Sequence, residues 1–234
     1  AAKLQVCTAR GAKVTELFAS GGVLSASHCD GYGNQNDVLI PVSEKSFAAA
    51  AELFVAIGEE GDLGGVCLVG IDIGGTKIEG VLLDATDRVI DVCRMPSHSG
   101  ESNVVTDIVR VARTLSNEPL PIGIGIPGQV NCATGQVSNV VNLDIETLEL
   151  GERVSAIMHA PVHVENDVNA AAVGAAEFVE QVDGNATVVF LNFGTGLAAG
   201  LVRGGQAEHG YSGSIGEIGH LPIDPNGFEC PCGQ

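Results

Sequence analysis

The sequence predicts an α/β fold, and two observations carry this prediction. After residue 66, short apolar runs that are typical of strands alternate with longer runs that are typical of helices. The chain has 234 residues, of which 45% are hydrophobic and 17% are charged, so it can bury a core and is not expected to be disordered. Its length suits one large domain or two small ones.

The predicted elements follow one another in a regular order after an acidic, glycine-rich segment at 58–65, which is typical of a linker or a long turn. Apolar or alternating runs predict the strands, and periodic or alanine-rich runs predict the helices. The expected strands are 66–73, 79–84, 88–93, 122–126, 162–165, 186–193 and 197–203, and the expected helices are 103–115, 151–159 and 168–178. Residues 66–234 therefore form the main domain in this prediction.

Residues 1–65 are predicted to form a separate α/β segment that ends in the linker. Strands are expected at 13–19 and 38–42, and a helix is expected at 46–57. His28 and Cys29 are adjacent, but no other ligand-type side chains group with them in the sequence, which favours a structural role. No chemistry is assigned to this segment.

The charge balance excludes some classes of partner. The formal net charge is −18, from 29 acidic and 11 basic residues, and no cluster of Lys and Arg is present to bind nucleic acid or an anionic membrane surface. No apolar run is long enough to span a bilayer, and the N-terminus has no signal-peptide pattern, so we expect a cytoplasmic protein. The odd number of cysteines, seven, fits free thiols or metal ligands better than a disulfide framework.

A glycine-rich turn at 72–77 is the first candidate site. Asp72 ends one strand, the pair Gly74 and Gly75 forms the turn, and Thr76 and Lys77 precede the next strand. Backbone N–H groups in such a turn can hold a phosphate, and Asp72 can hold Mg²⁺ through water. The same pattern is also common in hairpins that bind nothing, and it is not the strand–loop–helix nucleotide loop, which needs Gly-Lys-Ser/Thr.

A second turn of the same kind lies at Gly194, Thr195 and Gly196, between two predicted strands. Two such turns can hold one triphosphate from opposite sides, which suggests a nucleotide-handling enzyme.

Asp167 lies between a predicted strand and a predicted helix, after Glu165 and Asn166. In one interpretation it caps the helix, as Asp often does. In the other it is a carboxylate at the crevice where α/β sheets bind ligands, placed to take a proton from a hydroxyl during phosphoryl transfer. The residues alone leave both interpretations open.

His220, Cys230 and Cys232 are candidate ligands of a structural zinc ion, because zinc prefers thiolate and imidazole ligands and closely spaced cysteines on a turn suit it. A structural site needs a fourth ligand, which this chain does not supply in the same run. The site is therefore either completed by something absent or not formed.

From about residue 66 to the end, the chain resembles the ROK family, which groups bacterial sugar kinases with related repressors. The resemblance is collinear through several motifs, which are weak alone and specific together. They are the turn at 72–77, Gly-Ile-Gly-Ile-Pro-Gly at 123–128, Asn142 in Val-Val-Asn-Leu, the run 165–171, the turn at 194–196, the run 217–220, and Cys-Pro-Cys-Gly at 230–233.

The resemblance implies an actin-like ATPase (ribonuclease H-like) fold in two lobes, with the second lobe incomplete because the chain is C-terminally truncated relative to the family. It implies ATP-dependent phosphorylation of a hexose hydroxyl, such as the C6 hydroxyl of glucose, with Asp167 as the general base. The sugar would be bound by Gly128, Asn142, Asn166, Asp167, Glu217 and His220, and the phosphates and Mg²⁺ by Asp72, Gly74, Gly75, Thr76, Lys77, Gly194, Thr195 and Gly196. A homodimer is plausible for the family.

Two alternatives to a working kinase remain. A sugar-sensing transcriptional regulator of the same family would bind sugar without turning it over, although the first 65 residues are acidic and show no convincing helix-turn-helix. A non-catalytic fragment would lack the metal, and Cys230 and Cys232 would then react freely with thiol reagents.

Overall fold

The computed structural model describes residues 6–7, 13–20, 23–28, 67–85, 88–177, 187–193, 196–211, 213, 215–222, 224 and 227. The chain divides into two units, Ala1–Lys45 and Ser46–Gln234. The predicted strand 38–42, helix 46–57 and linker 58–65 lie outside the described residues, as does Cys29.

The first unit contains a three-stranded antiparallel sheet in the order β1-β2-β3. Its strands are β1 (Val6–Cys7), β2 (Lys13–Ser20) and β3 (Val23–His28), and the pairing of β2 with β3 shifts register between Val14 and Glu16. The predicted strand 13–19 is confirmed as β2, whereas β3 was not predicted.

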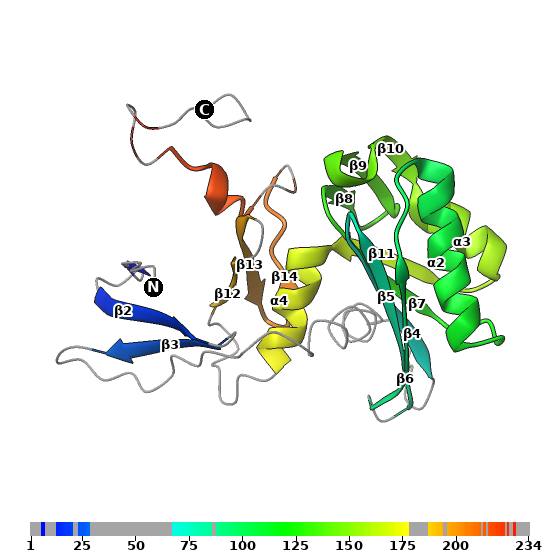
Figure 1. Cartoon of the computed structure of the whole chain (residues 1–234), viewed down its shortest axis with the longest axis horizontal. Helices are drawn as coiled ribbons and strands as arrows, with labels where there is room; N and C mark the ends of the chain where they lie inside the picture. The colour runs from blue at the N-terminus through cyan, green and yellow to red at the C-terminus, as the bar shows by residue number, and fades with distance from the viewer. Residues whose placement is uncertain are drawn as a thin grey trace. The chain divides into compact units, whose positions relative to one another are not determined.

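A five-stranded mixed sheet forms the centre of the second unit, in the order β11-β7-β4-β5-β6 (Figure 1). Its strands are β4 (Leu68–Ile73), β5 (Lys77–Leu83), β6 (Val89–Pro96), β7 (Ile122–Ile126) and β11 (Val162–Asn166). β4, β5 and β6 form an antiparallel meander, and β7 and β11 extend it as strands parallel to β4. The carboxyl ends of β4, β7 and β11 therefore share one edge of the sheet.

Helices α2 (Glu101–Leu115) and α3 (Leu150–Met158) cover one face of this sheet (Figure 1). α2 is amphipathic, because Val104, Ile108, Val111 and Leu115 recur at helical spacing and are buried. They pack on the isoleucines of β4 and β7 in one continuous core. Gly80 of β5 permits this close approach, since a Cβ there would lie 2.4 Å from Cγ1 of Val111.

Helix α4 (Asp167–Glu177) joins the five-stranded sheet to a second sheet of the same unit. It contacts β7 and β11 and packs more extensively on β12 (Thr187–Phe193) and β13 (Leu197–Arg203), which pair with β14 (Gln206–Ala207) in the order β12-β13-β14. Ala170, Ala172 and Val173 of α4 form a small core with Val202. The contact is close, because a Cβ at Gly200 would lie 2.4 Å from Cβ of Ala172.

The strands and helices predicted after residue 66 are confirmed with shifts of a few residues at their ends. β5 begins at Lys77, two residues before the predicted start, and β6 continues to Pro96 instead of ending at 93. Four strands that the structure describes in this unit were not predicted. One is β14, and the other three are β8 (Gln129–Asn131), β9 (Gln136–Val140) and β10 (Ile145–Glu149), which pair in the order β10-β9-β8. The 3-10 turn η1 (Val141–Leu143) connects β9 to β10. A second 3-10 turn, η2 (Ile218–His220), follows β14.

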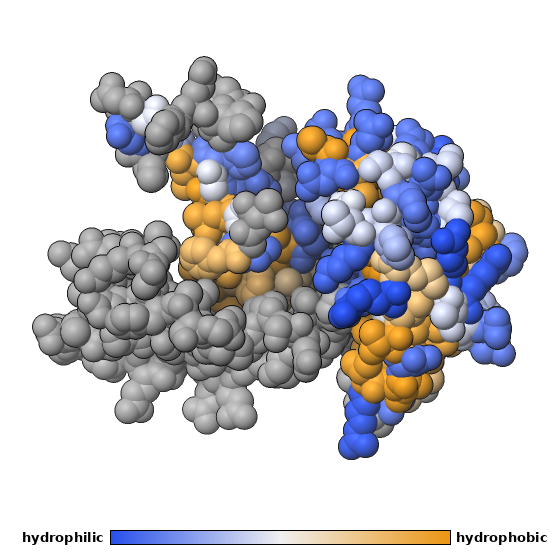
Figure 2. Space-filling view, viewed as in Figure 1, coloured by the Kyte–Doolittle hydropathy of each residue, from blue (hydrophilic) through white to orange (hydrophobic). Residues whose placement is uncertain are grey.

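The surface of the second unit mixes polar and apolar areas (Figure 2). Val89, Ile90 and Val92 of the edge strand β6 are each about half exposed, at 47%, 55% and 52%. Among the described residues, no helix combines the length and the apolarity that a membrane span requires.

Candidate active site

The candidate active site lies at the edge of the sheet where β4, β7 and β11 end. The strand register places Asp72 of β4 and Glu165 of β11 on either side of Gly125 of β7. Ligands of α/β sheets bind outside the carboxyl ends of parallel strands, so this edge is the place where chemistry is expected.

Asp72 and Asp167 both lie close to Gly125. A Cβ at Gly125 would lie 3.8 Å from Oδ1 of Asp72 and 3.6 Å from Cα of Asp167, so the glycine leaves the space between the two residues free. Burial raises the pKa of Asp72 to about 6; the charge of Asp167 adds to this effect and the charge of Lys77 opposes it. Two carboxylates in one partly buried space create a demand for a cation or a proton.

The pKa of Asp167 is also raised, chiefly by burial, and the N–H group of Val168 opposes the shift. The charge of Glu217 raises it further. A carboxylate with a raised pKa is a stronger base than an ordinary aspartate.

Asn166, and not Asp167, is the residue that caps α4. Its Oδ1 accepts hydrogen bonds from the backbone N–H groups of Val168 at 3.0 Å and Asn169 at 3.2 Å, as an N-cap side chain does. Asp167 is the first helical residue, and its Oδ1 accepts the N–H of Val168, at 2.9 Å. The cap interpretation of Asp167 is therefore wrong. Asn166 also donates from Nδ2 to the carbonyl oxygen of Gly128, at 3.1 Å.

The first glycine turn is a tight connection between β4 and β5. The N–H of Gly74 donates to the carbonyl oxygen of Lys77 at 2.9 Å, and the side chains of Thr76 and Lys77 are exposed. Gly75 lies against Asn142, since a Cβ there would be 3.2 Å from Cβ of Asn142. The turn thus contacts Asn142, a residue that the family resemblance implies in sugar binding.

The remaining predicted site residues are only partly described. Glu217 and His220 are exposed, with Oε2 of Glu217 3.9 Å from Nε2 of His220. Gly196 is described and exposed, whereas Gly194, Thr195, Cys230 and Cys232 lie outside the described residues. The second glycine turn and the predicted zinc ligands Cys230 and Cys232 therefore stay predictions.

A cluster that sequence reasoning missed is formed by Cys132, Glu165 and His209. Sγ of Cys132 lies 3.2 Å from Oε2 of Glu165 and 3.3 Å from Nε2 of His209, and the same Nε2 lies 2.6 Å from Oε2 of Glu165. Burial would raise the pKa of Glu165, but hydrogen bonds, first of all from His209, hold it below its ordinary value. The hydrogen bond to Glu165 raises the pKa of His209, and burial raises the pKa of the Cys132 thiol to about 12.

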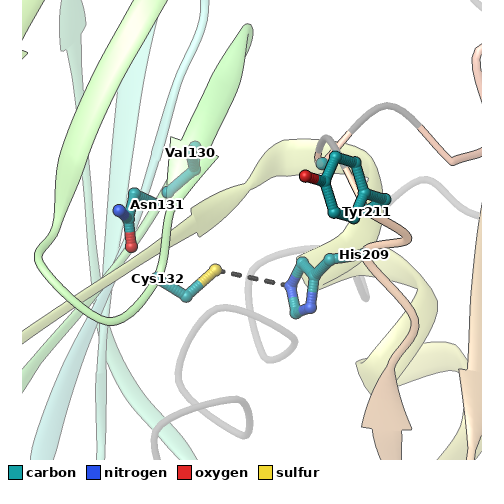
Figure 3. Close-up of a pocket in the computed structure, with 6 residues that line it drawn as sticks. Val130, Asn131, Cys132, His209 and Tyr211 are labelled. Carbon is teal, nitrogen blue, oxygen red and sulfur yellow. Dashed lines mark hydrogen bonds between the residues drawn. The ribbon is translucent and has the colours of Figure 1, made fainter.

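This cluster borders a cavity of about 340 Å³ (Figure 3). Cys132 and its neighbours Val130 and Asn131 line one side, and His209 and Tyr211 line the other. Glu165 is only 1% exposed and is not among the residues that line the cavity, but it contacts both Cys132 and His209. The three residues are separated by 33 and 44 positions in the sequence, and no motif spacing marks them.

Comparison with known proteins gives a consistent result. The model of the ROK family matches residues 68–234. A glucokinase of Streptomyces coelicolor is 34% identical over 168 residues, which are 71% of this chain and 53% of the glucokinase. Among solved structures, a ROK family glucokinase from Streptomyces griseus in complex with glucose and AMPPNP superimposes with a TM-score of 0.59 at 29% identity, covering 72% of this chain and 54% of that one.

A relative named as a repressor aligns over more of the chain. A protein of a Caldicellulosiruptor species named "Putative xylose repressor" is 30% identical over 228 residues, which are 94% of this chain and 52% of the relative. At 94% of the chain, that alignment must extend into the first 65 residues. The chain covers about half the length of these curated relatives.

Proposed function

The chain belongs to the ROK family, and from this premise we propose that it is the catalytic part of an ATP-dependent hexose kinase. Its α/β architecture is the actin-like ATPase fold that the sequence predicted, as the glucokinase superposition shows. The observation that carries the proposal is the pair of partly buried carboxylates, Asp72 and Asp167, beside Gly125 at the carboxyl edge of the parallel strands.

Asp167 is the general base in this proposal. Its Oδ1 accepts the N–H of Val168, which fixes the carboxylate and leaves Oδ2 to accept the proton of the attacking sugar hydroxyl. Burial and the charge of Glu217 raise its pKa and so strengthen it as a base. Phosphoryl transfer depends mainly on positioning and electrostatic stabilisation, and both are supplied by a base held at a helix terminus.

The residues present fit Mg²⁺, because the hard cation prefers carboxylate oxygens and Asp72 has a raised pKa that a nearby cation would lower. When bound, Mg²⁺ would neutralise charge on the phosphates of ATP. Asp72 would hold it, directly or through water, while the turn of Gly74 and Gly75, with Thr76 and Lys77, would contact the phosphates.

Sugar binding is assigned to residues around Asp167. Asn166 is held by Gly128 and by the start of α4, and it retains one Nδ2 hydrogen for a sugar hydroxyl. Glu217 acts electrostatically on Asp167, which supports a position at the same sugar. Asn142 borders Gly75, which would bring the sugar and phosphate contacts together. The hexose is glucose or a related sugar.

The test is sugar-dependent release of ADP from Mg-ATP over a panel of hexoses. Asp167→Asn keeps the size and the hydrogen-bond acceptor of the side chain but removes the base, and we expect turnover to fall by about 10²- to 10⁴-fold. Asp91→Asn is the matched control. Asp91 is exposed on β6, which lies at the opposite end of the strand order from β11. Equal turnover in Asp167→Asn and the parent would refute Asp167 as the base.

A sugar-sensing regulator is the second candidate, and the alignment of a named repressor with 94% of the chain favours it. A regulator would bind the sugar, release no ADP and be retained on a DNA or heparin column. The net charge of −18 opposes such retention unless it comes from another part of the protein. Sugar binding without turnover in the parent chain would favour the regulator over the kinase.

A structural zinc bound by His220, Cys230 and Cys232 also remains a proposal. The exposed position of His220 close to Glu217 supports it, since a metal there would shape the loop that carries the sugar-binding glutamate. Protection of Cys230 and Cys232 from thiol reagents, lost on adding a chelator, would support the site. Free reaction of both thiols before chelation would contradict the zinc site.

A homodimer is a separate proposal, and the molecular mass in solution tests it.

A further inference from the structure

The cluster of Cys132, Glu165 and His209 brings three different ligand types to one point. A cysteine thiol, a carboxylate oxygen and an imidazole nitrogen lie within 4.8 Å of one another. We infer that these three residues form a zinc site, separate from the position assigned to His220, Cys230 and Cys232.

The arrangement is that of metal ligands and not of a nucleophilic triad. A triad needs the cysteine on one imidazole nitrogen and the carboxylate on the other, so that the histidine relays a proton. Here Cys132 and Glu165 both contact Nε2 of His209, so all three side chains converge on a common point.

The distances between the three ligand atoms need only a small change to accommodate a zinc ion. Ligand atoms of a tetrahedral zinc site, at the usual bond lengths, lie about 3.3–3.6 Å apart. The two distances from Sγ of Cys132 are 3.2 and 3.3 Å, and the distance from His209 to Glu165 is 2.6 Å. Only the last pair must separate by more than a few tenths of an ångström, and the side chain of His209 is 38% exposed, which gives it room to move.

Glu165 is already oriented as a ligand. Its Oε1 accepts the backbone N–H of Asn166 at 2.7 Å and the Nδ2 group of Asn169 at 3.3 Å, which leaves Oε2 directed at Cys132 and His209. Such outer hydrogen bonds fix the orientation of metal-binding carboxylates. Because Glu165 is buried and held by α4, the ion would gain a rigid ligand without a further ordering cost.

The fourth coordination position faces the cavity. Cys132 and His209 line the cavity (Figure 3), and Glu165 is buried in contact with both, so an ion between the three would have its open side toward the cavity. A water molecule there completes a tetrahedral set of one sulfur, one nitrogen and two oxygens. The mixed ligand set suits zinc better than Mg²⁺ or Ca²⁺, which prefer oxygen alone.

Burial of Glu165 makes a cation favourable at this point. A carboxylate that is 1% exposed needs compensation, which His209 supplies in the absence of an ion. Zinc with one thiolate and one carboxylate forms a neutral group, so it satisfies the buried charge directly. The ion would also connect β11 and the β8–β9 turn to the segment after β14, beside the residue proposed as the base.

The experiment is a titration of the full chain with Co²⁺, which replaces zinc and gives a near-ultraviolet absorption when a thiolate binds it. The parent for the titration is the Cys230→Ser/Cys232→Ser variant, so that the other predicted zinc site does not contribute. We expect about one equivalent of Co²⁺ with thiolate absorption, displaced by Zn²⁺, and a Zn²⁺-dependent rise in Tm.

Cys132→Ser in this parent should abolish the thiolate absorption, and His209→Ala should weaken binding by about 10- to 100-fold. Cys67→Ser is the matched control, because Cys67 is a free, half-buried cysteine like Cys132 and lies outside the cluster. Thermal unfolding without metal identifies any variant that fails to fold. No thiolate absorption in the parent, or absorption that survives in Cys132→Ser, would overturn the inference.

Discussion

Asp72→Asn should make the folded chain more stable at neutral pH while it abolishes any kinase activity. The side chain of Asp72 is partly buried beside Asp167, and its pKa is raised from 3.8 to about 6. Asn has nearly the same shape but no charge, so it removes both the burial cost of the carboxylate and its repulsion of Asp167. Strain of this kind is typical of functional sites and is relieved by inactivating substitutions.

The size of the effect follows from the pKa difference. Because the folded state binds the proton of Asp72 more tightly than the unfolded state does, the favourable contribution is complete below pH 3.8 and is lost as the pH rises through about 6. At about 1.4 kcal/mol per pKa unit, the ionised carboxylate costs the fold about 3 kcal/mol above pH 6. The advantage of Asp72→Asn is therefore greatest at pH 7–8 and shrinks as the pH falls toward 4.

Urea unfolding of the parent and of Asp72→Asn, between pH 5 and pH 8 and without divalent cations, measures this difference. Asp91→Asn is the control, because Asp91 is exposed and its Oδ1 accepts the N–H of Val92, which Asn can also do. We expect the control to change stability by less than about 0.5 kcal/mol at every pH. Destabilisation by Asp72→Asn at pH 8, or a gain that does not depend on pH, would refute the reasoning.

Three further substitutions test the fold by urea unfolding. Gly80→Ala should lose about 1–3 kcal/mol, because the new methyl group would lie 2.4 Å from a side chain of α2, whereas Gly196→Ala, with nothing within 4 Å, should stay near the parent. Asn166→Ala should lose about 1 kcal/mol through the missing helix cap, and Asn166→Asp should recover most of it; equal stability of the two would contradict the cap. Arg94→Ala should lose about 1–3 kcal/mol, because buried Glu79 loses a two-point hydrogen-bonded partner, and Arg94→Lys should recover only part of that loss.

The elements with strong local patterns were predictable from the sequence. The apolar run at 122–126 is confirmed as β7 with the same bounds, and the run at 197–203 is confirmed as β13. By contrast, β8, β9 and β10 are short and carry polar residues at most positions. Asn139 and Asp144 adopt positive φ values of 55° and 54°, which no sequence pattern predicted. These strands are formed by pairing with one another, which is not a local property.

The site residues that lie in one sequence motif were predictable. The contacts that only the fold creates between distant residues were not. Asp72 and Asp167 each stand at the end of a recognisable strand, but their meeting beside Gly125 depends on a strand order that places β7 between β4 and β11. The interpretation of Asp167 as the helix cap, one of the two left open by the sequence, is wrong by one residue, because Asn166 occupies the non-helical position before the helix. Cys132 and His209 stand alone in the sequence and are joined to Glu165 only by tertiary packing.

The close contact of Ala172 with Gly200 limits how this part of the protein can evolve. A Cβ at Gly200 would lie 2.4 Å from Cβ of Ala172 and 2.9 Å from the carbonyl oxygen of Val168, so neither position can accept a larger side chain alone. A lineage that enlarges one of them would have to move α4 away from β13, and the first turn of α4 carries Asp167 and is capped by Asn166. Selection for the chemistry at one end of the helix would thus restrict side-chain size about one and a half turns further along it.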